Sequence, residues 1–343
     1  MNRRPGVVAG LVVVLVAACL LGVGIGTVGI SPGTTIRLIG WKLGLAGYPA
    51  GVPESTAVIL FELRVPRVLL GVAVGGALAA SGAVFQALFR NPMADPAIVG
   101  VSSGAALGAV AMILVGGGVF AGGLGVPLAA FVGALAVAFL VYRLARIGPA
   151  VQVATLLLAG IAVAAVISAV ISLVMSLAGE QIRSIYFWLL GGLAGRGWGT
   201  LLAALPLIAL GMAAAVLSVR DLNVMALGEE RAAQLGVEVE RFKRLTMATG
   251  ALLAGAAVSV AGVIGFVGLI TPHILRLLLG ADHRRLLPAS LLGGGALMVL
   301  ADLVARTALA PEEIPVGAVT ALLGGPFFLY LLRRERRAAG ARA

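Results

Sequence analysis

Charged residues are scarce in this sequence of 343 residues. They make up 11% of the chain, whereas 61% is hydrophobic, and the mean hydropathy is +1.11. This composition excludes a water-soluble globular protein and indicates a chain whose solvent is largely lipid. Because a helical span needs about 20 apolar residues, the length allows roughly ten spans and little else. We therefore expect an all-α integral membrane protein, with residues 1–343 forming a single transmembrane domain.

Cysteine, histidine and lysine are also rare. The single Cys19 excludes an internal disulfide, and two histidines leave too few ligands for a transition-metal site, so His273 and His283 are expected to be hydrogen-bonded structural residues. The two lysines, Lys42 and Lys243, do not follow a glycine, so the phosphate-binding Walker A loop is absent. We expect no metal and no cofactor bound by this chain itself, and no ATPase activity of its own.

Acidic residues number 14 and fall at the ends of the apolar runs or in loops. A gradient-driven carrier usually places ionisable groups in the middle of its spans, where protons or sodium ions bind. Asp95 and Asp302 come closest to the membrane interior, and Arg306 is a plausible helical partner four residues after Asp302. Paired carboxylates, a Ser/His dyad and an H-E-x-x-H motif are missing, which disfavours membrane enzymes. A secondary transporter and a membrane enzyme remain the alternatives from other classes.

Long apolar runs predict ten spans. They lie at about 6–28, 60–86, 96–115, 126–143, 151–177, 200–218, 287–305 and 316–332, with two more in the stretch 245–280, which Gly262, Gly265, Gly268 or Pro272 divides. Short interfacial helices are expected around Trp41 and between Glu180 and Trp198. Gly100, Gly104 and Gly108 have a spacing that predicts close helix packing. Residues 6–28 also allow a lipoprotein leader, because Val16–Cys19 resembles a cleavage box.

The basic residues are distributed unevenly between the connections. If the spans alternate, most of the 25 arginines and lysines fall on one side, with the densest group between Arg220 and Arg244. Cytoplasmic loops carry such an excess, so we place both termini and the segment 220–244 in the cytoplasm of a multi-pass inner-membrane protein. Within that segment, residues 228–236 predict a short polar helix closed by Gly236, which is suited to docking in a groove of another protein.

Several motifs, in the same order, resemble one family. They are Leu63-Arg64-Val65-Pro66-Arg67, Ser81–Gln86, Arg90-Asn91-Pro92-Met93-Ala94-Asp95-Pro96, Ala226–Gly236, Gly265–Leu269 with Pro272-His273, Asp282–Arg284, Glu313–Gly317 and Gly324–Pro326. From Arg64 onward nearly the whole chain is similar to the FecCD family, the permease subunits of type II ABC importers for vitamin B12, haem and ferric siderophores.

The resemblance implies a type II ABC importer permease fold and substrate import by alternating access. It implies a homodimer that works with two ATP-binding subunits, which carry ATP and Mg, and with a periplasmic or lipid-anchored substrate-binding protein. We expect the substrate to be an iron complex, either haem or a ferric siderophore, because iron-chelate importers are the more numerous members of the family. Cobalamin is the alternative substrate.

The resemblance also assigns roles to three groups of residues. Arg64, Arg67 and Arg306 match external arginines that pair with glutamates of the binding protein, and a guanidinium offers a carboxylate a bidentate fork. Asn91, Pro92 and Met93 match the cytoplasmic gate, with Met93 where leucine is common. The residues implied to couple the permease to the ATPase are Gly228, Glu229, Glu230, Arg231, Ala232, Gln234 and Gly236.

Overall fold

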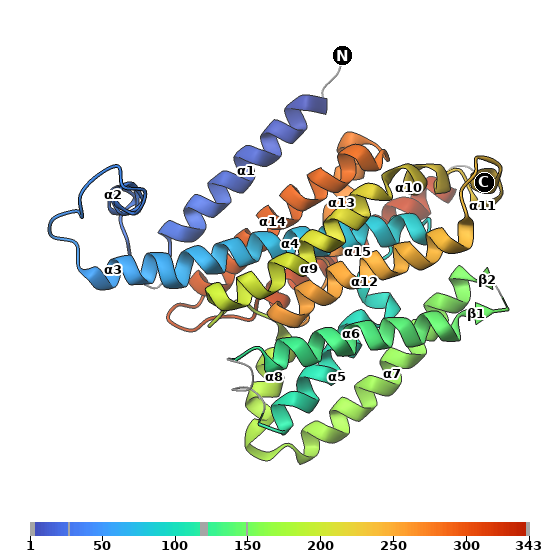
Figure 1. Cartoon of the computed structure of the whole chain (residues 1–343), viewed down its shortest axis with the longest axis horizontal. Coiled ribbons are helices and arrows are strands. Elements are labelled where there is room, and N and C mark those ends of the chain that lie inside the picture. Colours follow the sequence, from blue (N-terminus) through green and yellow to red (C-terminus); the bar gives the residue numbers. More distant parts are fainter. Residues whose placement is uncertain (1–3, 27, 117–122, 149, 341–343) are drawn as a thin grey trace.

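The computed structural model describes residues 4–26, 28–116, 123–148 and 150–340 and is almost entirely helical (Figure 1). Ten of its helices correspond to the ten predicted spans. They are α1 (Arg4–Gly24), α4 (Val65–Leu88), α5 (Val101–Leu114), α6 (Gly125–Leu144), α7 (Val153–Leu177), α9 (Trp198–Leu217), α12 (Val239–Ala261), α13 (Val267–Leu279), α14 (His283–Thr307) and α15 (Val316–Gly340). In the described part of the chain, seven helical segments are long and apolar enough to cross a membrane, and three shorter apolar helices accompany them.

Shorter elements occupy the connections. One end of the molecule holds α2 (Pro32–Lys42) and α3 (Glu54–Val58), which continues through a π-helical turn (Ile59–Arg64) into α4 (Figure 1). The opposite end holds α10 (Val219–Met225), α11 (Glu229–Gln234) and the antiparallel strands β1 (Arg146–Ile147) and β2 (Ala150–Val151). Helices α10 and α11, which lie mostly in the segment 220–244 predicted to be cytoplasmic, therefore share an end with the strands β1 and β2, and residues 29–57 lie at the other.

Helix α4 forms the centre of the bundle, and its packing depends on glycine. It is buried along most of its length and contacts α12, α13 and α14. A Cβ atom added at Gly75 would overlap the carbonyl oxygen of Gly294, so the backbones of α4 and α14 touch. Between α5 and α6, Gly104 and Gly108 make equally close contacts with Gly133 and Ala129. Because lipid tails are as apolar as the helix surfaces, the hydrophobic effect does not hold the helices together. Van der Waals contacts made possible by this close approach stabilise the packing instead.

Two predicted spans are shorter than expected. The run 96–115 forms a 3-10 turn (Pro96–Val99) and then α5 of 14 residues, and α13 has 13 residues. At 1.5 Å per residue each helix is about 20 Å long, less than the hydrocarbon core of about 30 Å. The division of 245–280 into two helices is confirmed, and the break occupies residues 262–266, with φ of 72° at Gly262 and 69° at Phe266. Pro272 lies inside α13.

The expected interfacial helices are also present. Helix α2 contains Trp41, and α8 (Ile182–Leu190) follows a 3-10 turn at Gly179–Gln181. Trp198, at the start of α9, donates its indole N–H to the carbonyl of Phe61 at 2.9 Å. That bond satisfies a carbonyl in the π-helical turn, where the regular helical pattern is interrupted.

Candidate functional site

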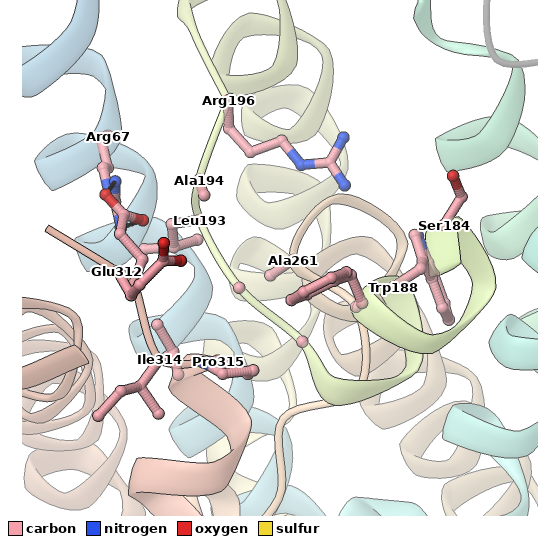
Figure 2. A pocket seen from close by; sticks show the side chains of 16 residues that line it. Arg67, Ser184, Trp188, Leu193, Ala194, Arg196, Ala261, Glu312, Ile314 and Pro315 are labelled. Atoms are coloured by element: carbon pink, nitrogen blue, oxygen red, sulfur yellow. Dashed lines mark hydrogen bonds and ion pairs between the residues drawn. The ribbon is translucent and has the colours of Figure 1, made fainter. Parts of the chain in front are cut away.

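Three irregular segments meet beside α4. They are residues 191–197 after α8, 262–266 after α12, and 308–315 before α15. The amide of Gly192 donates to the carbonyl of Ala261 at 2.7 Å, and the amide of Gly317 lies 3.4 Å from the carbonyl oxygen of Gly191. Non-helical backbone inside a membrane protein is tolerated where protein covers it or where it lines a cavity. Both conditions apply here, because these segments border a cavity of about 480 Å³ (Figure 2).

A second cavity, of about 510 Å³, adjoins the first. The two share the side chains of Arg67, Arg196 and Glu313 in their walls, and the second is also lined by Arg64 and Arg306. Four arginine side chains and one carboxylate therefore line the second cavity, near the start of α4. This is the end that the charge pattern places outside the cell, and it brings together the three arginines that the motifs singled out.

Arg67 binds two carboxylates. Its Nη2 lies 2.8 Å from Asp302 Oδ1, and its Nη1 and Nη2 each lie 2.9 Å from an oxygen of Glu313. The Asp302 side chain is 2% exposed and also lies 3.6 Å from Arg306 Nε. The predicted pair of Asp302 and Arg306 is thus confirmed. The closer partner, Arg67, escapes sequence reasoning because it lies 235 residues away.

Arg64 and Arg306 hold the end of α1. Arg64 Nη1 donates to the carbonyls of Val23, at 3.2 Å, and Gly24, at 2.9 Å, while its Nη2 donates to Val28. Arg306 Nη2 donates to the carbonyl of Gly22. The last carbonyls of a helix lack partners within it and carry partial negative charge, so guanidinium groups stabilise this end.

The proposed docking arginines are therefore engaged inside the chain in this conformation. Arg64 and Arg306 are only 6% and 4% exposed, and Arg67 is held by two carboxylates. Their role in docking a binding protein stays a prediction. It requires that carboxylates of the partner compete with these internal contacts.

The predicted gate residues lie in the turn between α4 and the 3-10 turn. Asn91 Oδ1 accepts a hydrogen bond from the amide of Met93 at 2.9 Å, and Pro92 stands between them. Arg90 has a φ of 49°, which turns the chain sharply after α4. The turn follows the carboxyl end of α4, so the length of that helix separates it from Arg67. A gating role stays a prediction.

The predicted polar helix at 228–236 is confirmed as α11. Gly228, with a φ of 106°, precedes it, and Gly236, with a φ of 84°, follows it. Of the implied coupling residues, Glu230, Arg231, Gln234 and Gly236 are exposed, Gly228 and Glu229 are partly buried, and Ala232 is buried. Their contact with an ATPase stays a prediction.

Lys243 ties α11 to its surroundings. Its Nζ lies 2.8 Å from Glu229, 3.1 Å from Glu240 and 2.9 Å from the carbonyl oxygen of Val151 in β2. The side chain is 6% exposed. The pair with Glu240, three residues away on α12, is visible in the sequence, whereas the bonds to Glu229 and Val151 depend on the fold.

The two histidines differ. His283 Nδ1 lies 2.8 Å from Asn223 Oδ1, which confirms the expected structural hydrogen bond. His273 makes no such bond: its Nδ1 is buried without a partner among the described residues, and the ring instead meets Phe327 edge-on at 6.3 Å between centroids. The expected hydrogen bond of His273 is therefore not seen among the described residues, where the ring packs against an aromatic side chain instead.

Known proteins resemble this chain over almost its full length. Residues 14–334 match the FecCD transport family. A cobalamin import system permease protein from Halobacterium salinarum is 53% identical over 289 residues, which cover 84% of this chain and 77% of that protein. A hemin transport system permease protein from Yersinia pestis is 44% identical over 292 residues, covering 81% and 84%.

A solved structure shares the architecture described above. It is an inward-facing metal-chelate type ABC transporter, 32% identical, and it superimposes with a TM-score of 0.82 over 96% of this chain and 99% of the other. The ten-helix arrangement, the motifs from Arg64 onward and the match over residues 14–334 agree. The chain is thus a multi-pass membrane permease of the ABC importer type and belongs to the FecCD transport family.

Proposed function

We propose that this permease imports a bulky metal chelate, as a homodimer with two ATP-binding subunits and one substrate-binding protein. The observation that carries the proposal is the full-length similarity to import permeases, combined with cavities at one end of the bundle and α11 at the other. ATP and Mg would reside on the partner subunits. In this scheme the permease itself catalyses no reaction, and it supplies a path whose two ends open in turn.

Cobalamin is the first substrate to test. The relative named for cobalamin import is 53% identical and the one named for hemin transport 44%, and the solved structure is of the metal-chelate type. Haem and ferric siderophores, the iron complexes expected because iron-chelate importers are the more numerous members of the family, remain the other candidates. All three are large chelates, for which cavities of about 500 Å³ would each hold a part of the molecule.

Coupling would run through Lys243. ATP binding draws two ATPase subunits together, and α11 would move with the subunit on which it rests. Because Lys243 Nζ holds Glu229 of α11, Glu240 of α12 and the carbonyl of Val151, that movement would reach α12 and the strands between α6 and α7. The turn containing Asn91, Pro92 and Met93 would then open or close the inner end of the path.

Reconstituted transport tests the proposal. The permease is placed in liposomes with its ATP-binding subunits, and uptake of cyanocobalamin, haem and a ferric siderophore is measured with the corresponding loaded binding protein. Uptake that requires ATP and one loaded binding protein supports the importer and identifies its substrate. Uptake driven by a sodium or proton gradient without ATP would contradict it and favour the carrier alternative.

A binding assay tests the docking arginines. Arg64→Gln, Arg67→Gln and Arg306→Gln are compared with Arg37→Gln, an exposed arginine of α2 at the same end. Variants that elute as folded dimers but bind the substrate-binding protein at least tenfold more weakly support docking, given that a charge-assisted hydrogen bond is worth roughly 1.5–3 kcal/mol. Unchanged affinity in all three variants would assign these arginines to the anchoring of α1 and the carboxylates alone.

A further inference from the structure

Arg196 differs from the other arginines of the two cavities. It lies in the 191–197 segment and lines both cavities. Arg64, Arg67 and Arg306 all bind carbonyls or carboxylates, whereas the guanidinium of Arg196 has no hydrogen-bond or ion-pair partner within the described chain. Its Nε is buried. The residue as a whole is partly exposed, and a partly buried cation without a protein partner is unfavourable, so this arrangement needs an explanation.

The surroundings of Arg196 suit an acceptor-bearing ligand. In Figure 2 its side chain extends toward Ser184 and Trp188 of α8, while Arg67 and Glu312 lie on the opposite side of the cavity. The indole Nε1 of Trp188 is likewise buried without a partner among the described residues. No described carboxylate lies within 4 Å of Arg196 to neutralise it.

The rest of the lining is largely apolar apart from Glu312 and Glu313, of which Glu313 is paired with Arg67. Phe187, Leu193, Ala261, Ile314 and Pro315 line the same cavity, whose volume of about 480 Å³ falls in the range of small-molecule sites. Desolvation lowers the pKa of Arg196, because burial disfavours the charged form, and a bound anion would reverse that effect. A largely apolar cavity whose one guanidinium without a protein partner among the described residues lies across from the carboxylates fits a ligand that has an apolar body and an anionic group.

We propose that this cavity is a subsite for a carboxylate or phosphate group of the transported chelate, and that Arg196 is its partner. The inference rests on the proposed function and specifies its substrate class: a chelate that carries a carboxylate or phosphate group rather than one that lacks such a group. Arg196 stands near the outer end, so the chelate would meet it soon after leaving the binding protein. One ion pair in a partly hydrated cavity selects for charge without retaining the substrate.

Pairs of chelates that differ in one type of acidic group test the subsite in ATP-driven uptake. Haem is compared with its dimethyl ester, which lacks both carboxylates, and cyanocobalamin with cobinamide, which lacks the phosphate. Arg196→Gln should reduce uptake of the chelate that carries the carboxylate or phosphate, below saturation, on the order of tenfold, while leaving the analogue that lacks this group within about twofold. Arg196→Lys should retain part of the discrimination. Arg183→Gln, an exposed arginine at the start of α8, is the matched control and should change neither.

Two other outcomes would overturn the inference. Equal loss of uptake for the acid and its analogue would show a merely structural role for Arg196. Weaker binding of the unloaded binding protein to the Arg196→Gln permease would show that Arg196 meets a carboxylate of that protein instead.

A second readout needs no transport. Haem and its ester are titrated against the detergent-solubilised complex, and quenching of tryptophan fluorescence, including that of Trp188, reports binding. The subsite predicts at least tenfold weaker haem binding in Arg196→Gln and no difference for the ester. Equal haem affinity of wild type and variant contradicts the subsite, whereas absence of ATP-dependent uptake by the wild type contradicts the proposed function alone.

Discussion

Asp302 stabilises the outer end of the bundle through two arginines at once. It is 2% exposed and lies 2.8 Å from Arg67 and 3.6 Å from Arg306. Removing one member of a buried ion pair leaves an uncompensated charge, which costs about 3–5 kcal/mol. We therefore expect Asp302→Asn to lower the free energy of unfolding by that amount, seen as an earlier thermal transition of the purified permease in detergent.

Glu313 supplies the control for that experiment. It binds the same guanidinium of Arg67 at 2.9 Å, but its side chain is 34% exposed. Water screens an exposed pair, so Glu313→Gln should cost no more than about 1 kcal/mol. Similar losses of stability in Asp302→Asn and Glu313→Gln would show that burial does not make the Asp302 pair worth more than the Glu313 pair. That result would contradict the stabilising role assigned to Asp302.

Asp282 caps α14 with a titratable group. Its Oδ1 accepts from the amide of Arg284 at 3.0 Å and from Asn223 Nδ2 at 2.8 Å. The hydrogen bond from the Arg284 amide is the main reason that the pKa of Asp282 lies below its usual 3.8. The hydrogen bond from Asn223 and the positive charges of nearby arginines add to the effect. A carboxyl group whose pKa is lowered by folding stabilises the fold above its unfolded pKa, and this contribution is lost as pH falls through the folded value.

Replacing this cap gives a pH-dependent prediction. Asp282→Ala should cost about 1 kcal/mol at pH 7, and the gap from wild type should shrink below pH 3.8 as the wild-type carboxylate is protonated. Asp282→Asn keeps an N-cap side chain that does not titrate, so its stability should lack this pH dependence. Thermal unfolding at pH 7 and pH 3 measures both, and a gap that stays constant for Asp282→Ala would contradict the capping role.

Residue-level predictions from the sequence succeed where helical spacing fixes the contact. The predicted pair of Asp302 and Arg306 lies four residues apart, so the helix brings the two side chains together. The bonds from Arg67 to Asp302 depend on the packing of α4 against α14, which no local pattern encodes. Arg196 carries no local signal at all, because its distinctive property is the lack of a partner in the fold.

At the scale of helices, glycine decides how closely α5 and α6 approach. A Cβ at Gly104 would overlap the carbonyl oxygen of Gly133. Gly104→Leu should therefore force the two helices apart and cost about 1–3 kcal/mol of stability. On α1, nothing lies within 4 Å of a Cβ at Gly10, so Gly10→Leu is the matched control and should leave the thermal transition unchanged. An equal effect at both positions would refute the packing explanation.

Lys243 gives a prediction about coupling between helices. Lys243→Met keeps most of the side-chain volume but removes the bonds to Glu229, Glu240 and Val151. We expect uptake per ATP hydrolysed to fall several-fold, since α11 would no longer move with α12. Lys243→Arg should keep most of the coupling. If Lys243→Met reduced ATPase activity and uptake in the same proportion, Lys243 would serve ATPase assembly rather than transmission.

The helices themselves were largely predictable, because apolar runs of span length have few alternatives in lipid. All ten predicted spans contain a helix, and the Gly-rich stretch 245–280 does divide. The break at 262–266 could not be located among Gly262, Gly265, Gly268 and Pro272, since its position depends on the neighbouring segment at 191–197. The shortness of α5 has a similar origin: Pro96 packs against Gly268 and starts the 3-10 turn before the helix begins.

At the scale of the whole molecule, the alternation of helices sorts the connections onto two ends. Residues 29–57 and the cavities with Arg67 lie at one end, and α11 with the β1–β2 pair lies at the other (Figure 1). The fold fixes which segments share a side, but the direction across the membrane follows from the excess of arginine around 220–244. Docking, gating and the Arg196 subsite all depend on that direction.

Cysteine labelling tests the orientation directly. The single native Cys19 is replaced by serine, and Leu45→Cys and Leu235→Cys are introduced separately at positions that are 79% and 53% exposed. A membrane-impermeant maleimide should label Leu45→Cys on intact spheroplasts, and Leu235→Cys only after the membrane is opened. Because the two sites lie at opposite ends of one bundle, they should never be labelled from the same side. The reverse pattern would place α11 outside, where no ATP-binding subunit could reach it, and would exclude the importer orientation.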